Sequence, residues 1–219
     1  MPFDAVIFDL DGTLIDTERL VLEAGLETFD AFGMDIGRDF LLSLIGVAEA
    51  EGRRRIEARL GPGADLRGLE VHWEGAIQRR YQAGIPLKPG VEELLGALDG
   101  LPCAVATNSA TANARRKLDS TGIARHFAHV VGFDAVARPK PAPDVFAEAA
   151  RRLGADPGRC IAFEDSDTGV AAALAAGMRV VQVPDLHASG HAGAHHLAAS
   201  LVEGARSAGL LGGPAIRRR

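Results

Sequence analysis

At residues 4–13 the chain reads DAVIFDLDGT, an apolar run that ends in two aspartates, a glycine and a threonine. The run Asp4–Phe8 is short and does not alternate with polar residues, which is typical of a strand buried on both faces. In an open parallel sheet, ligands bind beyond the carboxyl ends of the strands. Because an extended backbone turns alternate side chains to the same side, Asp9 and Asp11 are predicted to face one site.

Further short apolar runs are predicted strands, and helical stretches separate them. The predicted strands are Pro102–Thr107, His129–Gly132, Cys160–Phe163 and Val180–Val183. The predicted helices are Val91–Leu98, Ala110–Ser120, Pro143–Leu153 and Gly169–Ala176, several of them bounded by glycine or proline. This alternation of strands and helices predicts an α/β fold with a doubly wound parallel sheet.

Residues 16–85 interrupt the alternation because they contain no strand pattern. Apolar residues recur there at helical spacing, and helices are predicted at Phe40–Leu44, Ala48–Leu60 and Leu69–Gln82. We therefore predict an all-helical domain inserted after the first strand. The predicted division is 1–15 and 86–205 for the α/β core, 16–85 for the inserted domain and 206–219 for a C-terminal tail.

Composition restricts the class of partner. The formal net charge is −5, so no basic excess is present to neutralise nucleic-acid phosphates, and no nucleic-acid partner is expected. No apolar run approaches the length of a membrane span, and the chain opens directly into a strand without a basic leader, so no membrane partner and a cytoplasmic location are expected. Cys103 and Cys160 lie in strand-like runs and are predicted to be buried free thiols.

Polar residues also follow three of the other predicted strands. Thr107-Asn108, Lys140 and Glu164-Asp165 each have an ordinary explanation, as helix caps or as a surface lysine. Taken together, they place carboxylates, a hydroxyl group and an ammonium group on one edge of one sheet. Folding alone does not explain that coincidence, so a catalytic site is predicted at this edge.

The four elements, in this order, resemble the motifs of the haloacid dehalogenase-like hydrolase superfamily. Asp9–Thr13 is similar to the first motif, Thr107 to the second, Lys140 to the third and Glu164-Asp165 to the fourth. The inserted helical region is similar to the cap of the β-phosphoglucomutase and sugar-phosphatase branch. The resemblance covers residues 3–183 and implies a Rossmann-like core carrying a helical cap domain.

This resemblance implies a Mg²⁺-dependent phosphatase that acts through an aspartyl-phosphate. Asp9 would be the nucleophile and Asp11 the general acid and base. Thr107, Asn108 and Lys140 would bind phosphoryl oxygens. The implied ligands of Mg²⁺ are the carboxylates of Asp9 and Asp165, the backbone oxygen of Asp11, and Glu164 directly or through water.

The inserted domain would select the substrate, with Gly46 and Glu49 as its implied contacts. The expected substrate is a small phosphorylated metabolite, either a sugar phosphate or a phosphoglycolate-like acid, and the expected assembly is a monomer or homodimer. By resemblance, β-phosphoglucomutase carries an arginine near the position of Glu49. A glutamate there would repel a bisphosphate, so a phosphomutase ranks second.

Two further alternatives stay open on the sequence. The first is dehalogenation of small acids, against which Asp11 argues because the dehalogenases of the family lack the second aspartate. The second is a non-enzymatic, receiver-like module that accepts a phosphoryl group on Asp9. Receivers lack a long helical insertion and the Asp-x-Asp-Gly-Thr pattern, so an enzyme is the favoured prediction.

Overall fold

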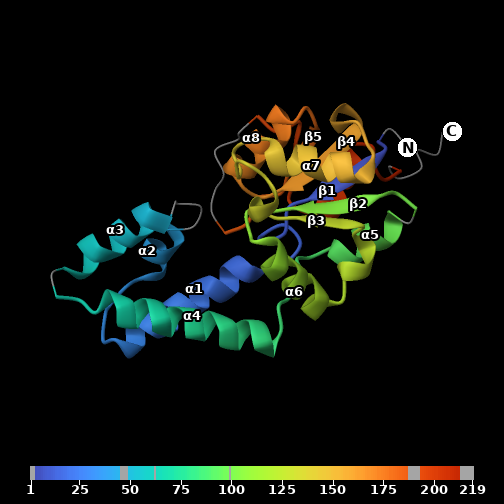
Figure 1. Cartoon of the computed structure of the whole chain (residues 1–219). Coiled ribbons are helices and arrows are strands. Elements are labelled where there is room, and N and C mark those ends of the chain that lie inside the picture. Colours follow the sequence, from blue (N-terminus) through green and yellow to red (C-terminus); the bar gives the residue numbers. More distant parts are fainter. Residues whose placement is uncertain (1–2, 45–48, 62, 99, 187–192, 213–219) are drawn as a thin grey trace. The chain divides into compact units, whose positions relative to one another are not determined.

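The computed structural model describes residues 3–44, 49–61, 63–98, 100–186 and 193–212. Within these ranges one parallel sheet of six strands is present, in the order β3-β2-β1-β4-β5-β6 (Figure 1). The strands are β1 (Ala5–Phe8), β2 (Cys103–Ala106), β3 (His129–Val131), β4 (Cys160–Glu164), β5 (Arg179–Gln182) and β6 (His196–Leu197). The predicted fold class, an α/β fold with a doubly wound parallel sheet, is confirmed.

The strand order places the predicted site at the centre of the sheet. From β1 the chain moves outward through β2 and β3, and then returns to the other side of β1 with β4. Ile7 of β1 therefore lies between Ala104 of β2 and Ala162 of β4. Such a reversal of strand order is where ligands bind in open α/β sheets. Because all strands run parallel, Asp9, Thr107 and Asp165 follow strand ends at the same edge.

Helices cover both faces of this sheet. They are α5 (Val91–Ala97), α6 (Thr111–Thr121), α7 (Asp144–Leu153), α8 (Asp167–Ala175) and α9 (Leu201–Ser207), with short 3₁₀ turns η1 (Ala124–His126), η2 (Phe133–Ala135) and η3 (Pro157–Arg159). On one face Ile7 packs in a buried cluster with Phe146 of α7 and Val170 of α8. On the other, the ring of Phe8 stacks on Phe163 with 5.1 Å between centroids. Burial of both faces accounts for the unbroken apolar runs of the strands.

Capping side chains move two helix starts away from their predicted positions. Helix α4 (Leu66–Ala83) begins three residues before the predicted Leu69, because the Asp65 side chain accepts a hydrogen bond from the Gly68 N–H. Helix α8 begins two residues before the predicted Gly169, because Ser166 caps it in the same way. Strand β6 was not predicted, since two residues are too few for a periodic pattern.

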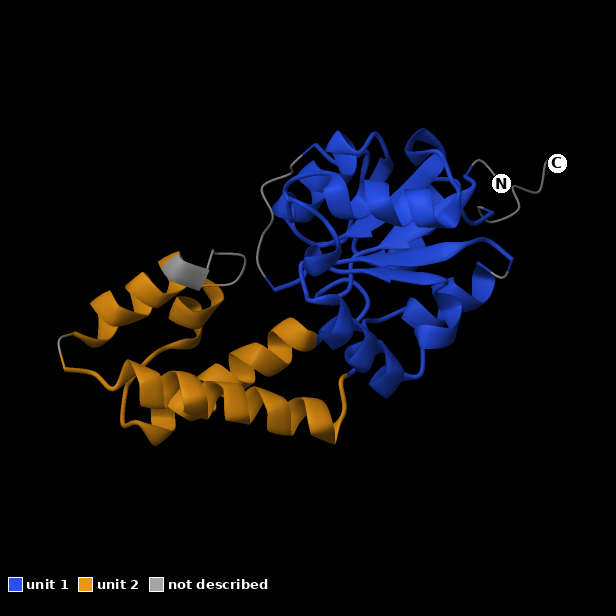
Figure 2. Ribbon diagram, viewed as in Figure 1, with its two compact units in different colours: residues 1–16, 86–219 blue, residues 17–85 orange. Residues whose placement is uncertain are grey.

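The chain divides into two compact units, residues 1–16 with 86–219 and residues 17–85 (Figure 2). The second unit contains helices α1 (Thr17–Ala31), α2 (Arg38–Leu42), α3 (Glu49–Leu60) and α4. Helices α1 and α4 pack against each other. The Trp73 indole N–H of α4 donates to the backbone carbonyl of Val21 in α1, at 3.1 Å. Gly25 leaves room for the same ring, because a Cβ there would lie 2.8 Å from Trp73. Trp73 is therefore a packing residue of this unit.

Among the described residues, none of the helices combines the length and hydropathy that spanning a bilayer requires. Cys103 and Cys160 are buried free thiols, as predicted. Burial raises the pKa of Cys103 to about 12, so this thiol stays protonated and unreactive near neutral pH.

Candidate active site

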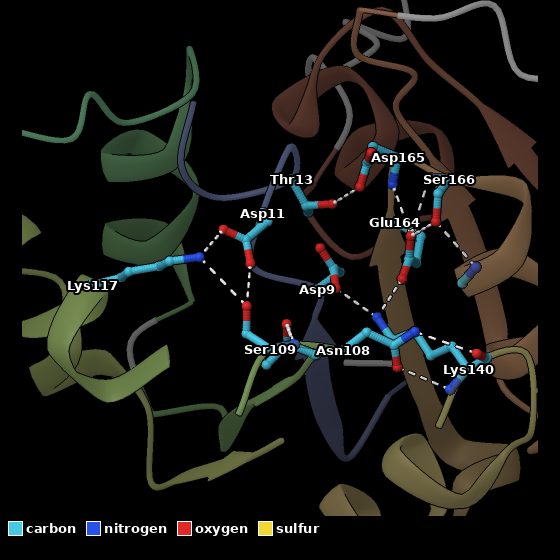
Figure 3. A network of polar contacts seen from close by, with 12 residues as sticks. Asp9, Asp11, Thr13, Asn108, Ser109, Lys117, Lys140, Glu164, Asp165 and Ser166 are labelled. Carbon is cyan, nitrogen blue, oxygen red and sulfur yellow. Dashed lines mark hydrogen bonds and ion pairs between the residues drawn. The ribbon is translucent and has the colours of Figure 1, made fainter. Parts of the chain in front are cut away.

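Asp9 and Lys140 form a buried ion pair at the central edge of the sheet (Figure 3). Lys140, in the loop before α7, donates from Nζ to Oδ1 of Asp9 at 2.5 Å, and each residue is only 7% exposed. The ring of Phe146 lies 4.8 Å from the same Nζ. Burial acts to lower the pKa of Lys140, but the carboxylates of Asp9 and Glu164 raise it above its ordinary value. Lys140 therefore supplies a fixed positive charge beside Asp9.

Glu164, at the end of β4, is fully buried and held from two sides. Its Oε1 accepts the second hydrogen bond of Lys140 Nζ, at 2.5 Å. Its Oε2 accepts from the backbone N–H groups of Asp165 and Ser166 and from the Ser166 hydroxyl, at 3.0–3.1 Å. Gly169 makes room for this carboxylate, since a Cβ there would lie 1.7 Å from Oε1. The contacts fix Glu164 and, through it, the position of the Lys140 ammonium.

Asp165 is oriented by the loop that follows β1 and by β5. Its Oδ1 accepts from the Thr13 hydroxyl at 2.9 Å. Gly12, with φ +87°, lies against the other oxygen, where a Cβ would come within 2.7 Å. The buried amide of Gln182 donates to the Asp165 carbonyl at 3.4 Å and to the Asp167 carboxylate at 2.9 Å. The loop after β1 therefore positions the Asp165 carboxylate, and β5 holds its backbone.

The carboxyl groups of Asp9, Glu164 and Asp165 form a compact acidic group. One oxygen from each lies within 4.8 Å of the others. Lys140 Nζ donates to Asp9 and to Glu164 of this group, and burial raises the pKa of Asp9 against the lowering effect of Lys140. Oxygen ligands of this kind suit hard divalent cations. The residues present therefore fit a metal ion that would offset the remaining negative charge.

The Asp11 carboxyl points away from Lys140 and toward a different pair of donors (Figure 3). The Ser109 hydroxyl donates to Oδ2 at 2.8 Å, and Lys117 Nζ donates to Oδ1 at 2.6 Å. Neither donor was predicted from the sequence. Lys117 lies on α6 after two exposed arginines, so the sequence alone suggests a side chain on the solvent-exposed face of that helix. One feature of the sequence could have indicated its position. Lys117 is three residues from the buried Ala114, and this spacing places it at the border of the buried face of the helix.

Thr107 and Asn108 lie in the loop that follows β2. Thr107 is 1% exposed, and its hydroxyl accepts from the Ser109 N–H at 3.0 Å. The Asn108 side chain accepts from the Lys140 N–H at 2.9 Å and donates to the Lys140 carbonyl at 3.3 Å. This amide therefore holds the Lys140 loop, a use that sequence reasoning missed.

The predicted substrate contacts of the helical unit are not part of this geometry. Gly46 lies outside the described residues, and so does the side chain of Glu49, the first residue of α3. Both stay predictions from the resemblance. The structure brings together Asp9, Glu164, Asp165 and Lys140, whereas Asp11 contacts Ser109 and Lys117.

Comparison with known proteins identifies relatives along most of the chain. The model of the haloacid dehalogenase-like hydrolase family matches residues 3–177. The protein CbbY of Rhodobacter capsulatus is 37% identical over 87% of this chain and 89% of its own length. The fructose-1-phosphate phosphatase YqaB of Escherichia coli is 32% identical over 83% of this chain and 96% of its own.

A solved structure has the same fold over nearly the whole chain. It is that of CbbY from Rhodobacter sphaeroides, a variant in complex with xylulose-(1,5)bisphosphate. Its TM-score is 0.70 at 31% identity, and the match covers 90% of this chain and 94% of that one. The predicted resemblance to the sugar-phosphatase branch is thereby confirmed.

Proposed function

Because the chain belongs to the haloacid dehalogenase-like hydrolase family and is a phosphatase like its named relatives, we propose that it hydrolyses a phosphorylated sugar through a phosphoryl group carried on Asp9. The observation that carries this proposal is the buried Asp9 carboxylate, held by Lys140 beside two further carboxyl groups. The names of two relatives support a sugar phosphate: the fructose-1-phosphate phosphatase YqaB, and the phosphorylated carbohydrates phosphatase of Thermotoga maritima, which is 30% identical over 80% of this chain and 82% of its own length.

Mg²⁺ is the proposed cofactor. Its ligands would be the carboxylates of Asp9 and Asp165 and the backbone carbonyl of Asp11, with Glu164 completing the set directly or through water. When bound, the ion would reduce repulsion between the phosphate dianion and the carboxylate nucleophile and stabilise charge in the transition state. The acidic group fits this role because its three carboxyl groups are buried together beside the Lys140 ammonium.

Each remaining step is assigned to a residue of the chain. Asp9 attacks phosphorus in line, so that a bond forms between its carboxylate oxygen and phosphorus while the bond to the leaving oxygen breaks. Asp11 gives its proton to that leaving oxygen and later takes one from the water that attacks the aspartyl-phosphate. Lys140, Thr107 and the backbone N–H of Asn108 would hold the phosphoryl oxygens.

The helical unit, residues 17–85, is proposed to act as a cap over this site. A cap excludes water and contacts the part of the substrate that leaves with the alcohol. Gly46 and Glu49 are its proposed contacts.

The test is phosphate release by the purified protein and by the variant Asp9→Asn. Wild-type protein should release phosphate from p-nitrophenyl phosphate and from fructose 1-phosphate with added Mg²⁺, and EDTA should abolish both reactions. Asp9→Asn should lose at least about 10²–10³ in kcat while keeping its melting temperature. Asp119→Asn, an exposed carboxylate on α6, is the matched control and should keep full activity. Near-wild-type turnover by Asp9→Asn, or turnover unaffected by EDTA, would contradict the proposal.

Substrate choice is tested separately with a panel of phosphorylated sugars. Release of inorganic phosphate, measured without a bisphosphate activator, is expected to be fastest for sugar monophosphates. Interconversion of sugar phosphate isomers without phosphate release would instead identify a phosphomutase. Equal rates on all members of the panel would exclude selection by the helical unit.

A further inference from the structure

Lys117 lies in the site but has no role in the chemistry assigned so far. Its Nζ donates to Asp11 at 2.6 Å and to the Ser109 hydroxyl at 3.4 Å, while Ser109 donates to the other Asp11 oxygen at 2.8 Å. The Lys117 and Asp11 side chains are 16% and 27% exposed. Both oxygens of the Asp11 carboxyl are therefore held by donors from one segment, the β2–α6 connection and α6 itself.

Helix α6 is fixed in place, so this contact is built into the fold. Its first residue, Thr111, donates its N–H and its hydroxyl to the Asp134 carboxylate at 2.8 and 2.7 Å. Ala114 and Leu118 bury the helix against the sheet. Long side chains on a helix point back toward its N-terminus, and this direction carries the Lys117 ammonium to the edge of the sheet.

The same contacts keep Asp11 separate from the acidic group. Asp9 and Glu164 meet at Lys140, whereas Asp11 turns toward Lys117 and Ser109 (Figure 3). A carboxylate only two residues from Asp9 could otherwise turn toward a bound cation and become a further ligand. A carboxyl group bound in that way could not carry a proton to the leaving group.

Resting on the proposed function, we propose that Lys117 is a positioning residue that reserves Asp11 for proton transfer. When the bond from phosphorus to the leaving oxygen breaks, that oxygen takes the Asp11 proton, and the resulting carboxylate accepts hydrogen bonds from Lys117 and Ser109. In the second half of the reaction, the attacking water gives its proton to Asp11 as its oxygen bonds to phosphorus and releases Asp9. Lys117 itself gives up no proton.

The test compares two esters that differ in their need for proton donation. An alkyl phosphate such as fructose 1-phosphate releases a basic alkoxide and depends on a general acid, whereas p-nitrophenyl phosphate releases a stable phenolate. The value of kcat/KM includes only the steps up to departure of the alcohol. The variants are Lys117→Met, Lys117→Arg and, as the matched control, Arg116→Met, which removes the charge of an exposed neighbour on the same helix.

Lys117→Met should lower kcat/KM at least about tenfold for the alkyl ester, mainly through kcat, and much less for the nitrophenyl ester. Lys117→Arg should restore part of the loss, and Arg116→Met should resemble wild type. Equal losses on both esters with a lowered melting temperature would show a structural role and overturn the proposal. A loss confined to KM would make Lys117 a substrate contact and also overturn it.

The proposed function fails in a distinguishable way. If wild-type protein released phosphate from neither ester, both proposals would fall. If wild-type protein hydrolysed both esters and Lys117→Met matched it on each, only the role of Lys117 would be excluded.

Discussion

At the residue scale, the site depends on side chains that fit against glycines. The Glu164 carboxylate occupies the space where a Cβ of residue 169 would lie, and the Asp165 carboxylate lies against Gly12. These carboxylates are fully or almost fully buried. The space left by these two glycines therefore determines the positions of the carboxylates as much as hydrogen bonds do.

Gly169→Ala is predicted to reduce activity more than stability. The new Cβ would displace Glu164, and Lys140 would lose one of the two carboxylates that hold it. Loss of one electrostatic partner typically lowers kcat by about 10²–10³. The matched control is Gly96→Ala in α5, where a Cβ meets nothing within 4 Å and should leave kcat unchanged. Steady-state kinetics and thermal melting check this, and wild-type kcat in Gly169→Ala would refute it.

Metal binding is predicted to strengthen as the pH rises. Burial raises the pKa of Asp9 above its ordinary value, so at a given pH this carboxyl holds its proton more firmly than an exposed aspartate does. A proton and a cation compete for the same oxygens, so the apparent affinity for Mg²⁺ should increase until the pH exceeds that pKa. Calorimetric titration at pH 6 and pH 8.5 measures this, and Asp9→Asn should remove most of the difference. Tighter binding at the lower pH would contradict the assignment.

At the scale of elements, one helix start is capped by a different segment. The N-cap of α6, Ala110, provides no side-chain hydrogen bond, and Asp134 of η2 supplies it instead. Gly132 allows the two segments to approach, since a Cβ there would lie 2.4 Å from the Thr111 nitrogen. The cap connects the end of β3 to the helix that carries Lys117.

Asp134→Ala is predicted to lower the free energy of unfolding, the usual effect of losing a helix cap. The carboxylate also has a lowered pKa because the Thr111 hydroxyl and N–H donate to it. Its contribution is therefore present above the unfolded pKa of 3.8 and is lost as the pH falls through the lower folded value. Denaturant unfolding at neutral pH measures the cost. Asp119→Ala, exposed on the same helix, should change stability by less than about 0.5 kcal/mol.

At the scale of the whole molecule, the two chain segments that lead to and from residues 17–85 are hydrogen-bonded to each other within the first unit. The Asp16 N–H donates to the Pro86 carbonyl at 2.9 Å, and the Lys88 N–H donates to the Leu14 carbonyl at 3.0 Å. Lys88 also pairs with Asp185, in the segment after β5. The chain thus leaves and re-enters the α/β unit at one point.

Replacing residues 17–85 by a short Gly/Ser loop is predicted to leave a folded α/β unit. The ends to be joined are already adjacent, so closing the loop costs little entropy. The product should still hydrolyse p-nitrophenyl phosphate, but its preference among sugar phosphates should disappear if the removed helices are the cap. Circular dichroism and the phosphate-release panel test this. Unchanged preference would assign substrate selection to the α/β unit.

The fold class could be predicted because strands buried on two faces leave an unbroken apolar run, and strand–helix alternation permits few topologies. The residues following strand ends could be predicted for the same reason, since parallel strands end at one edge. Asp9, Lys140, Glu164 and Asp165 are of this kind. Their chemistry is local to a motif, and each motif lies directly beyond a strand or in the loop before a helix.

Only the folded chain places Lys117 on Asp11, Asn108 on the Lys140 backbone and Gly169 against Glu164. The first two contacts join residues 106 and 32 positions apart, and they depend on the order of the strands and the position of α6, which periodicity does not encode. Gly169 and Glu164 are close in sequence, but their contact depends on the buried carboxylate occupying the space where a Cβ of residue 169 would lie. Side-chain spacing specifies which face a residue occupies, whereas its partner there is set by packing between elements.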